Sequence, residues 1–146
     1  MSKRVSIVKA IAEIFKSING TGLYKTNLYS NSYAKLKFWD EIQDFPAVYV
    51  HPTNEIRDYL PGGFVWGLLD ICIKVYVKNE EDSQEDLENL LIDLENCIDL
   101  NRTLVYDTTN NYETTEIQIQ SITTDEGLLI PYAVGEINLQ VRYQIM

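Results

Sequence analysis

Two adjacent carboxylates in the segment ITTDEGLLIPYAVGEINLQVRY, Asp125 and Glu126, have the most evident capacity for acid–base chemistry. Such a pair works when burial raises the pKa of one member, so that one donates a proton and the other accepts one. Here the pair follows two threonines and precedes Gly127, between two stretches of alternating apolar and polar residues. That context is typical of an exposed turn between strands, which supplies no burial. We therefore interpret the pair as turn residues, with a docking contact as the alternative and catalysis least favoured.

The other side chains suited to catalysis or metal binding are few. The single histidine, His51, ends the stretch AVYVH before a proline, and no G-x-S-x-G motif orients a nucleophile against it. Cys72 and Cys97 fall within predicted secondary structure, and we expect both to be free and buried in a reducing compartment. One histidine and two separated cysteines make a poor zinc site, and no phosphate-loop motif is present. We predict no catalytic residue, no cofactor and no metal, and hence no enzyme.

Charge and length limit the classes of function further. The chain has 146 residues with 12 Lys and Arg against 22 Asp and Glu, a formal net charge of -10. Proteins that read DNA or RNA attract phosphates with clustered cations, so this balance argues against that class. The length suits one domain, residues 1–146, with a core of its own. The basic start MSKR precedes an amphipathic stretch, which argues against a signal peptide or a membrane span.

Two amphipathic helices are expected to hold the core. The first has Ser2 as a possible N-cap and ends at Asn19-Gly20. The second occupies EDSQEDLENLLIDLENCIDL, where Asp82 and Glu85 have the spacing of a capping box, and so do Ser83 and Asp86. The apolar stripes are Ile7, Val8, Ile11, Ile14, Phe15 and Ile18 on the first helix, and Leu87, Leu90, Leu91, Leu94, Cys97 and Ile98 on the second. The outer face of the second helix carries Glu85, Glu88, Asp93 and Glu95, which we expect in solvent or, alternatively, against a cationic neighbour.

Four stretches alternate as strands of an antiparallel sheet do: FPAVYVHP, LLDICIKVYVK, EIQIQSI and EINLQVRYQI. Between the first two, TNEIRDYLPGGFVWG forms two extended arms around a Pro-Gly-Gly turn. The polar segments TGLYKTNLYSNSYAK and YDTTNNYETT are predicted as irregular connections. We predict an α+β fold: a four-stranded, mainly antiparallel sheet with two helices packed on one face, plus a long hairpin.

In this order the segments resemble the tail terminator (tail completion) proteins of long-tailed bacteriophages, the group that includes the lambda tail terminator. The likeness rests on FPAVYV after an N-terminal helix, LLDICIKVYVKNEED, the helix LENLLIDLENCI, TTEIQIQSITTDEG and GEINLQVRYQ. It spans Val5 to Gln144 and leaves the loop from Leu23 to Lys35 unmatched. These are patterns of alternation and turn chemistry, without a unique fingerprint.

The resemblance implies a structural protein of the virion tail or neck, made in the host bacterial cytoplasm. It implies a homohexameric ring that caps the finished tail tube, ends tube polymerisation and offers a surface to the head connector. The family has no catalytic residues to carry over. DNA would pass through the lumen without specific binding, and a ring of subunits with charge -10 would repel its phosphates if the acids face the channel.

The hairpin is the expected docking surface on the tube. We predict interface roles for Tyr59, Leu60, Pro61, Phe64 and Trp66, because aromatic and apolar side chains beside a turn are costly to leave in water. Asp125 and Glu126 are further interface candidates. The alternative is that the hairpin side chains fold back over the sheet.

Two other functions fit the same sequence. One is a different phage neck or head–tail joining protein, which would differ only in the partner it contacts. The other is a small cellular enzyme or ligand-binding α+β domain, which would need a pocket with convergent polar groups. The sequence contains no cluster of polar residues that indicates such a pocket.

Overall fold

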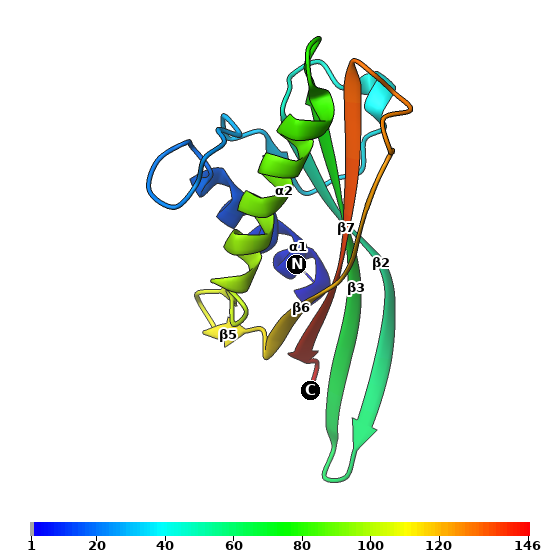
Figure 1. The fold of residues 1–146 in the computed structure, drawn as a ribbon. Coiled ribbons are helices and arrows are strands. Elements are labelled where there is room, and N and C mark those ends of the chain that lie inside the picture. The colour runs from blue at the N-terminus through cyan, green and yellow to red at the C-terminus, as the bar shows by residue number, and fades with distance from the viewer. Residues whose placement is uncertain (1) are drawn as a thin grey trace.

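The chain folds into a twisted sheet with two helices on one face (Figure 1). This computed structural model describes residues 2–146. The helices are α1 (Lys3–Ile14), extended by the 3-10 turn η1 (Phe15–Ser17), and α2 (Ser83–Asp99). The main sheet has the order β1-β2-β3-β7-β6. Its strands are β1 (Ser32–Tyr33), β2 (Ala47–Leu60), β3 (Phe64–Lys78), β6 (Glu116–Thr124) and β7 (Tyr132–Gln144). The predicted α+β class is confirmed.

The strand count is larger than the four predicted. The extra strand, β1, pairs in parallel with Val48 and Tyr49 of β2, and every other pair in the main sheet is antiparallel. A separate two-stranded sheet, β4 (Val105–Asp107) and β5 (Tyr112–Glu113), lies in a segment predicted to be irregular. Strands of two or three residues are too short to show alternation, so the sequence pattern could not reveal them.

Both helix starts follow from local sequence. The Ser2 hydroxyl accepts from the Val5 N–H at 3.2 Å, and the Asp82 carboxylate accepts from the Glu85 N–H at 3.0 Å. These side chains satisfy backbone donors that have no partner within the helix. The predicted N-cap Ser2 is therefore confirmed, and of the two candidates for the second helix the N-cap is Asp82.

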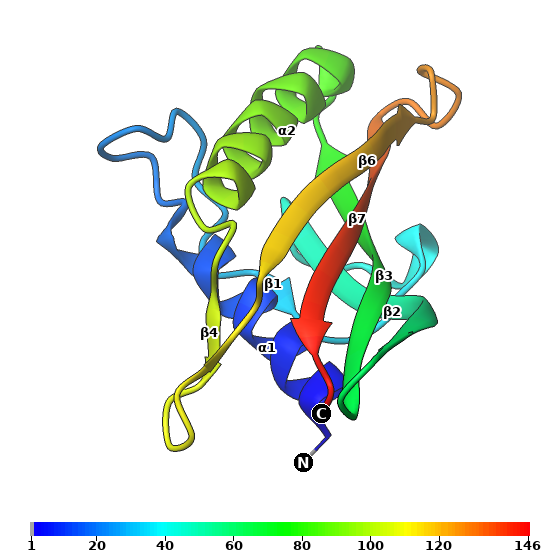
Figure 2. The same ribbon diagram turned by 90° about the horizontal axis from the view of Figure 1, so that it is seen from below.

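The core lies between the helices and one face of the sheet, as the alternation predicts. The inward residues of β3 and β7 are buried: Leu69, Ile71, Ile73, Val75, Val77, Ile137, Leu139, Val141 and Tyr143. α1 packs on β2, and α2 packs on β3, β7 and β6 (Figure 2). At Gly135 an added Cβ would lie 3.1 Å from Leu87 and 3.3 Å from Leu91, so the missing side chain lets α2 approach the sheet closely.

The opposite face of the sheet is only partly covered. The segment after β1, including the 3-10 turn η2 (Trp39–Glu41), crosses to this face near the α2 N-terminus (Figure 1). It closes a small second cluster that contains Ile42, Ala47, Tyr49 and Tyr76. Farther along the strands this face carries the polar side chains of the alternating pattern.

One prediction about the outer face of α2 was wrong. Asp93 is not in solvent but 1% exposed. Its carboxylate accepts from the backbone N–H of Lys25 at 3.1 Å and of Thr26 at 2.7 Å, and from the Thr26 hydroxyl at 2.5 Å. The carboxylate thus anchors the irregular segment between η1 and β1. Helical periodicity identifies a polar flank but cannot tell solvent from a docked loop.

Candidate functional site

The long hairpin formed by β2 and β3 extends past the end of the sheet (Figure 1). β7 ends at Gln144, which pairs with Trp66, whereas the hairpin continues to the pair of Leu60 and Phe64. Gly62 and Gly63 have φ of 88° and 82° in the turn, in a region where a side chain would be strained. The predicted Pro-Gly-Gly turn between two extended arms is confirmed.

Apolar side chains at the hairpin tip are in water. Tyr59 is 69% exposed, Phe64 51% and Leu60 39%. Because side chains alternate along a strand, Leu60 and Phe64 lie on the uncovered face of the sheet, where Ile56, also exposed, extends the same stripe. We call Ile56, Leu60 and Phe64 the hairpin stripe. Exposed apolar side chains gathered in this way are common at protein–protein contact sites.

Two residues of the hairpin are less available than these. Val65 is buried, and its backbone bonds to the chain end, donating to the Met146 carbonyl at 3.1 Å. Trp66 is half-buried, and the Arg142 guanidinium lies 5.0 Å from its ring centroid. The alternative prediction, that the hairpin side chains fold back over the sheet, therefore holds for Val65 and partly for Trp66. It does not hold for the side chains at the tip of the hairpin.

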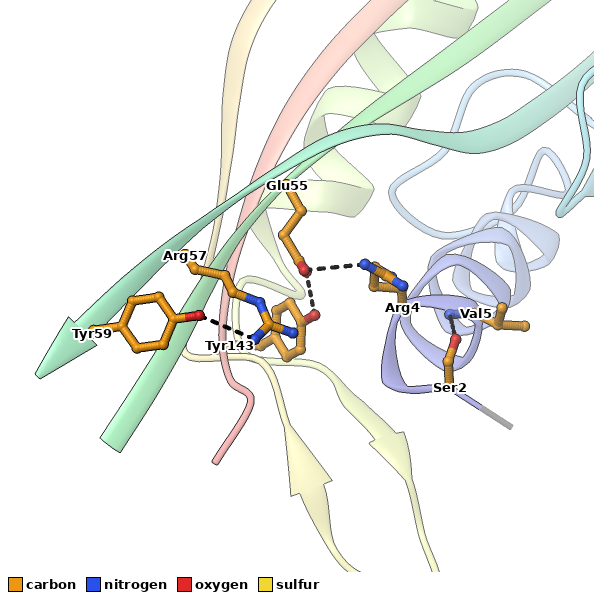
Figure 3. A network of polar contacts seen from close by, with 7 residues as sticks. All are labelled: Ser2, Arg4, Val5, Glu55, Arg57, Tyr59 and Tyr143. Atoms are coloured by element: carbon orange, nitrogen blue, oxygen red, sulfur yellow. Dashed lines mark hydrogen bonds and ion pairs between the residues drawn. The ribbon is translucent and has the colours of Figure 1, made fainter. Parts of the chain in front are cut away.

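A polar network at the base of the hairpin ties it to α1 and β7 (Figure 3). The Glu55 carboxylate, largely buried, accepts from the Tyr143 hydroxyl and from Arg4 at 3.3 Å. Burial, with help from Glu55, raises the pKa of Tyr143, so the phenol keeps the proton that it donates. Gly67 makes room for this network, because an added Cβ would lie 2.7 Å from the Tyr143 ring. The network fixes where the hairpin leaves the body of the protein.

The carboxylates Asp125 and Glu126 lie in the turn between β6 and β7, as predicted. Asp125 organises this turn, because its carboxylate accepts from the N–H groups of Leu129 at 3.1 Å and Val134 at 3.2 Å. Glu126 is exposed with φ of 57°, followed by Gly127 with φ of 82°. Asp125 is thus held by backbone donors while Glu126 lies in solvent, which indicates that the pair serves the structure of the turn. Neither carboxylate is buried in the way that acid–base catalysis by such a pair requires.

Replacing Asp125 with alanine should lower the free energy of unfolding by about 2 kcal/mol. The change leaves two backbone N–H groups and the Gln84 amide, which donates to Asp125 at 2.9 Å, without their acceptor. Glu126→Ala, one residue away and free of such bonds, should change it by less than about 0.5 kcal/mol. Urea denaturation compares the two, and equal losses would contradict this assignment.

A cluster on the uncovered sheet face was missed by the sequence reasoning. The β2–β3 register places His51 opposite Cys72, and the Cys72 thiol donates to Glu136 at 3.0 Å while Lys74 pairs with the same carboxylate at 3.1 Å. Alternation puts Cys72 and Lys74 on one face, but only the register between strands reveals their partners.

The chemistry open to this cluster is limited. Burial raises the pKa of Cys72 to about 12, so the thiolate that a nucleophile requires is disfavoured. Burial and nearby Lys74 lower the pKa of His51, which keeps the imidazole neutral, and its buried Nδ1 has no partner in residues 2–146. A protonated thiol and a neutral imidazole make this cluster poorly suited to covalent catalysis.

Residues 2–146 contain no group of three or more His, Cys, Asp or Glu side chains arranged to hold a metal ion. No helix among them has the length and apolar character needed to cross a membrane.

Comparison with known proteins gives three consistent results. Residues 1–146 match the family described as bacteriophage tail tube terminator protein. The chain is 40% identical over 153 aligned residues to the tail tube terminator protein p142 of Escherichia phage T5, covering 99% of this chain and 95% of that protein. Its fold matches a chain in the virion of a native gene transfer agent particle with a TM-score of 0.60. That chain is 10% identical, with 98% of this chain and 99% of that one covered, so the likeness concerns the fold alone.

Proposed function

The chain belongs to the bacteriophage tail tube terminator family, and from this premise we propose that its copies form a six-membered ring on the end of the tail tube. It is a structural protein of the virion tail. In the proposed role the ring ends tube polymerisation on one side and offers its other side to the head connector or neck. Neither task requires a catalytic residue.

The observation that carries this proposal is the exposed apolar tip of the hairpin. Leu60 and Phe64 of the hairpin stripe lie beyond the last residue pair of β3 with β7, while the Glu55 network holds the base of the hairpin in place. A rigid projection loses little conformational entropy on docking, so more of the contact energy remains for binding. We assign the tip to the tube and the opposite end of the sheet to the neck.

The charge balance supports passage of DNA through the ring. A net charge of -10 on each subunit would repel phosphates, so the genome could move without sticking. Binding of the lumen to a particular DNA sequence is not expected.

A polymerisation assay tests this function. Purified tube protein should elongate until this protein is added, after which the length distribution should stop shifting and negative-stain images should show ring-shaped caps. An alanine variant at the hairpin stripe serves as the matched control at the same concentration. Continued elongation with saturating wild-type protein would contradict the proposal.

A further inference from the structure

The two lateral edges of the fold carry opposite charge. The sheet runs from β1 at one edge to β6 at the other, and α1 lies toward the first edge and α2 toward the second (Figure 2). A ring built from identical subunits in head-to-tail contact needs two different lateral surfaces that fit one another. The edges of this chain meet that requirement.

The β1 edge is basic. Lys9 from α1, Lys16 from η1 and Lys35 beside β1 line one hollow of about 350 Å³, together with Tyr33. Glu13 is the only acid among the lining residues, and it pairs with Lys16 at 3.1 Å. We call Lys9, Lys16 and Lys35 the lysine edge. In a chain with 12 cations and 22 anions, such a grouping departs from the overall balance.

The β6 edge is acidic. Gln84 of α2 donates to Asp125 in the β6–β7 turn, so the flank of α2 that includes Glu88 and Glu95 faces this edge. The other flank is turned toward the irregular segment that Asp93 holds. We call Glu88, Glu95 and Asp99 the acidic edge.

The carboxylates of the acidic edge repel one another. Burial raises the pKa of Glu95, and Asp99 and Glu88 raise it further. Among residues 2–146, none of the three carboxylates has a lysine or arginine nitrogen within 4 Å. Cations supplied from outside the subunit would relieve this repulsion.

We propose that the lysine edge of one copy docks on the acidic edge of the next copy. This contact rests on the proposed ring and names the surfaces that build it. Attraction between the edges orients approaching subunits and excludes like-with-like pairing, because two acidic or two lysine edges repel. Within residues 2–146 the outer edge of β6 has no strand partner, so no strand of the sheet blocks approach from that side.

Charge reversal provides the test. Variant one carries Lys9→Glu, Lys16→Glu and Lys35→Glu, and variant two carries Glu88→Lys, Glu95→Lys and Asp99→Lys. Each variant alone has two edges of like sign and should not assemble. An equimolar mixture restores opposite charges at every contact of an alternating ring with an even number of subunits. A third variant with Glu41→Lys, Glu80→Lys and Glu81→Lys matches the charge change of variant two; Glu41 lies in η2 on the other face of the sheet, and Glu80 and Glu81 lie in the turn between β3 and α2.

Two measurements are made on folded proteins whose circular dichroism melting matches that of the wild type. Sedimentation velocity at low salt should show a larger species in the mixture than in either variant alone, and added salt should remove it. The number of capped tube ends should fall at least tenfold for variant one alone and for variant two alone. It should return to within twofold of the wild-type number for their mixture. The third variant should cap as many tube ends as the wild type.

The outcomes separate this contact from the ring proposal. A mixture that sediments as unassociated variants would overturn the charge contact, as would normal capping by either variant alone. Wild-type protein that never caps tubes would refute the proposed function. Sedimentation of the mixture would still decide the lateral contact in that case.

Discussion

Replacing Phe64 and Leu60 together with alanine should weaken capture of the tube end at least 30-fold without unfolding the protein. Losing an apolar anchor at the centre of an interface costs about 2 kcal/mol or more, which corresponds to roughly 30-fold in affinity. Both side chains are already substantially in water, so the free energy of unfolding should change by less than about 1 kcal/mol. Binding to immobilised tube fragments and thermal melting measure the two effects.

A matched control is available at the far end of the sheet. Leu128 is even more exposed than Leu60 and lies in the β6–β7 turn, away from the hairpin. Leu128→Ala should leave tube capture unchanged. Normal capture by the variant lacking Phe64 and Leu60, or a large fall in its melting temperature, would contradict the assignment of the hairpin stripe to the interface.

Replacing Asp93 with alanine should destabilise the protein by about 3 kcal/mol. The carboxylate is the acceptor for two backbone N–H groups and one hydroxyl of the segment between η1 and β1. Its removal leaves these donors without partners in a partly buried place, at about 1–3 kcal/mol for each buried group that stays unsatisfied. Denaturant unfolding gives the total loss, and hydrogen exchange at Lys25 and Thr26 should report local opening.

Asp99→Ala is the control for this substitution, since it removes the same group from the same helix. Asp99 is exposed at the helix C-terminus, where a negative charge is unfavourable, so its loss should be neutral or slightly stabilising. Similar losses for Asp93→Ala and Asp99→Ala would show that the loop does not depend on the buried carboxylate.

The features of the fold that were predicted correctly are those that produce a regular spacing of apolar residues in the sequence. The alternation of β3 and β7 placed Ile73 and Ile137 in the core correctly, and three-to-four spacing located both helices. Features set by contacts between distant segments escaped prediction. The short strand β1 and the burial of Asp93 depend on where an irregular segment returns to the body, which no local pattern records.

At the candidate site, too, the features set by local sequence were predicted and those set by contacts between distant strands were not. The Pro-Gly-Gly turn predicted a hairpin, and adjacency to the turn predicted that Phe64 would be exposed. The sequence could not show that Arg142 partly covers Trp66, because the two residues are 76 positions apart. Nor could it place Tyr143 against Glu55, since that contact depends on the register of three strands and on the missing side chain at Gly67.

The most direct test is a cryo-electron microscopy reconstruction of tube ends capped with this protein. We expect a closed six-membered ring whose hairpins point at the tube, with Leu60 and Phe64 buried against tube protein. The β1 edge of each subunit should lie against the β6 edge of its neighbour. A monomer on the tube end, or a ring whose hairpins point away from the tube, would contradict the proposed function.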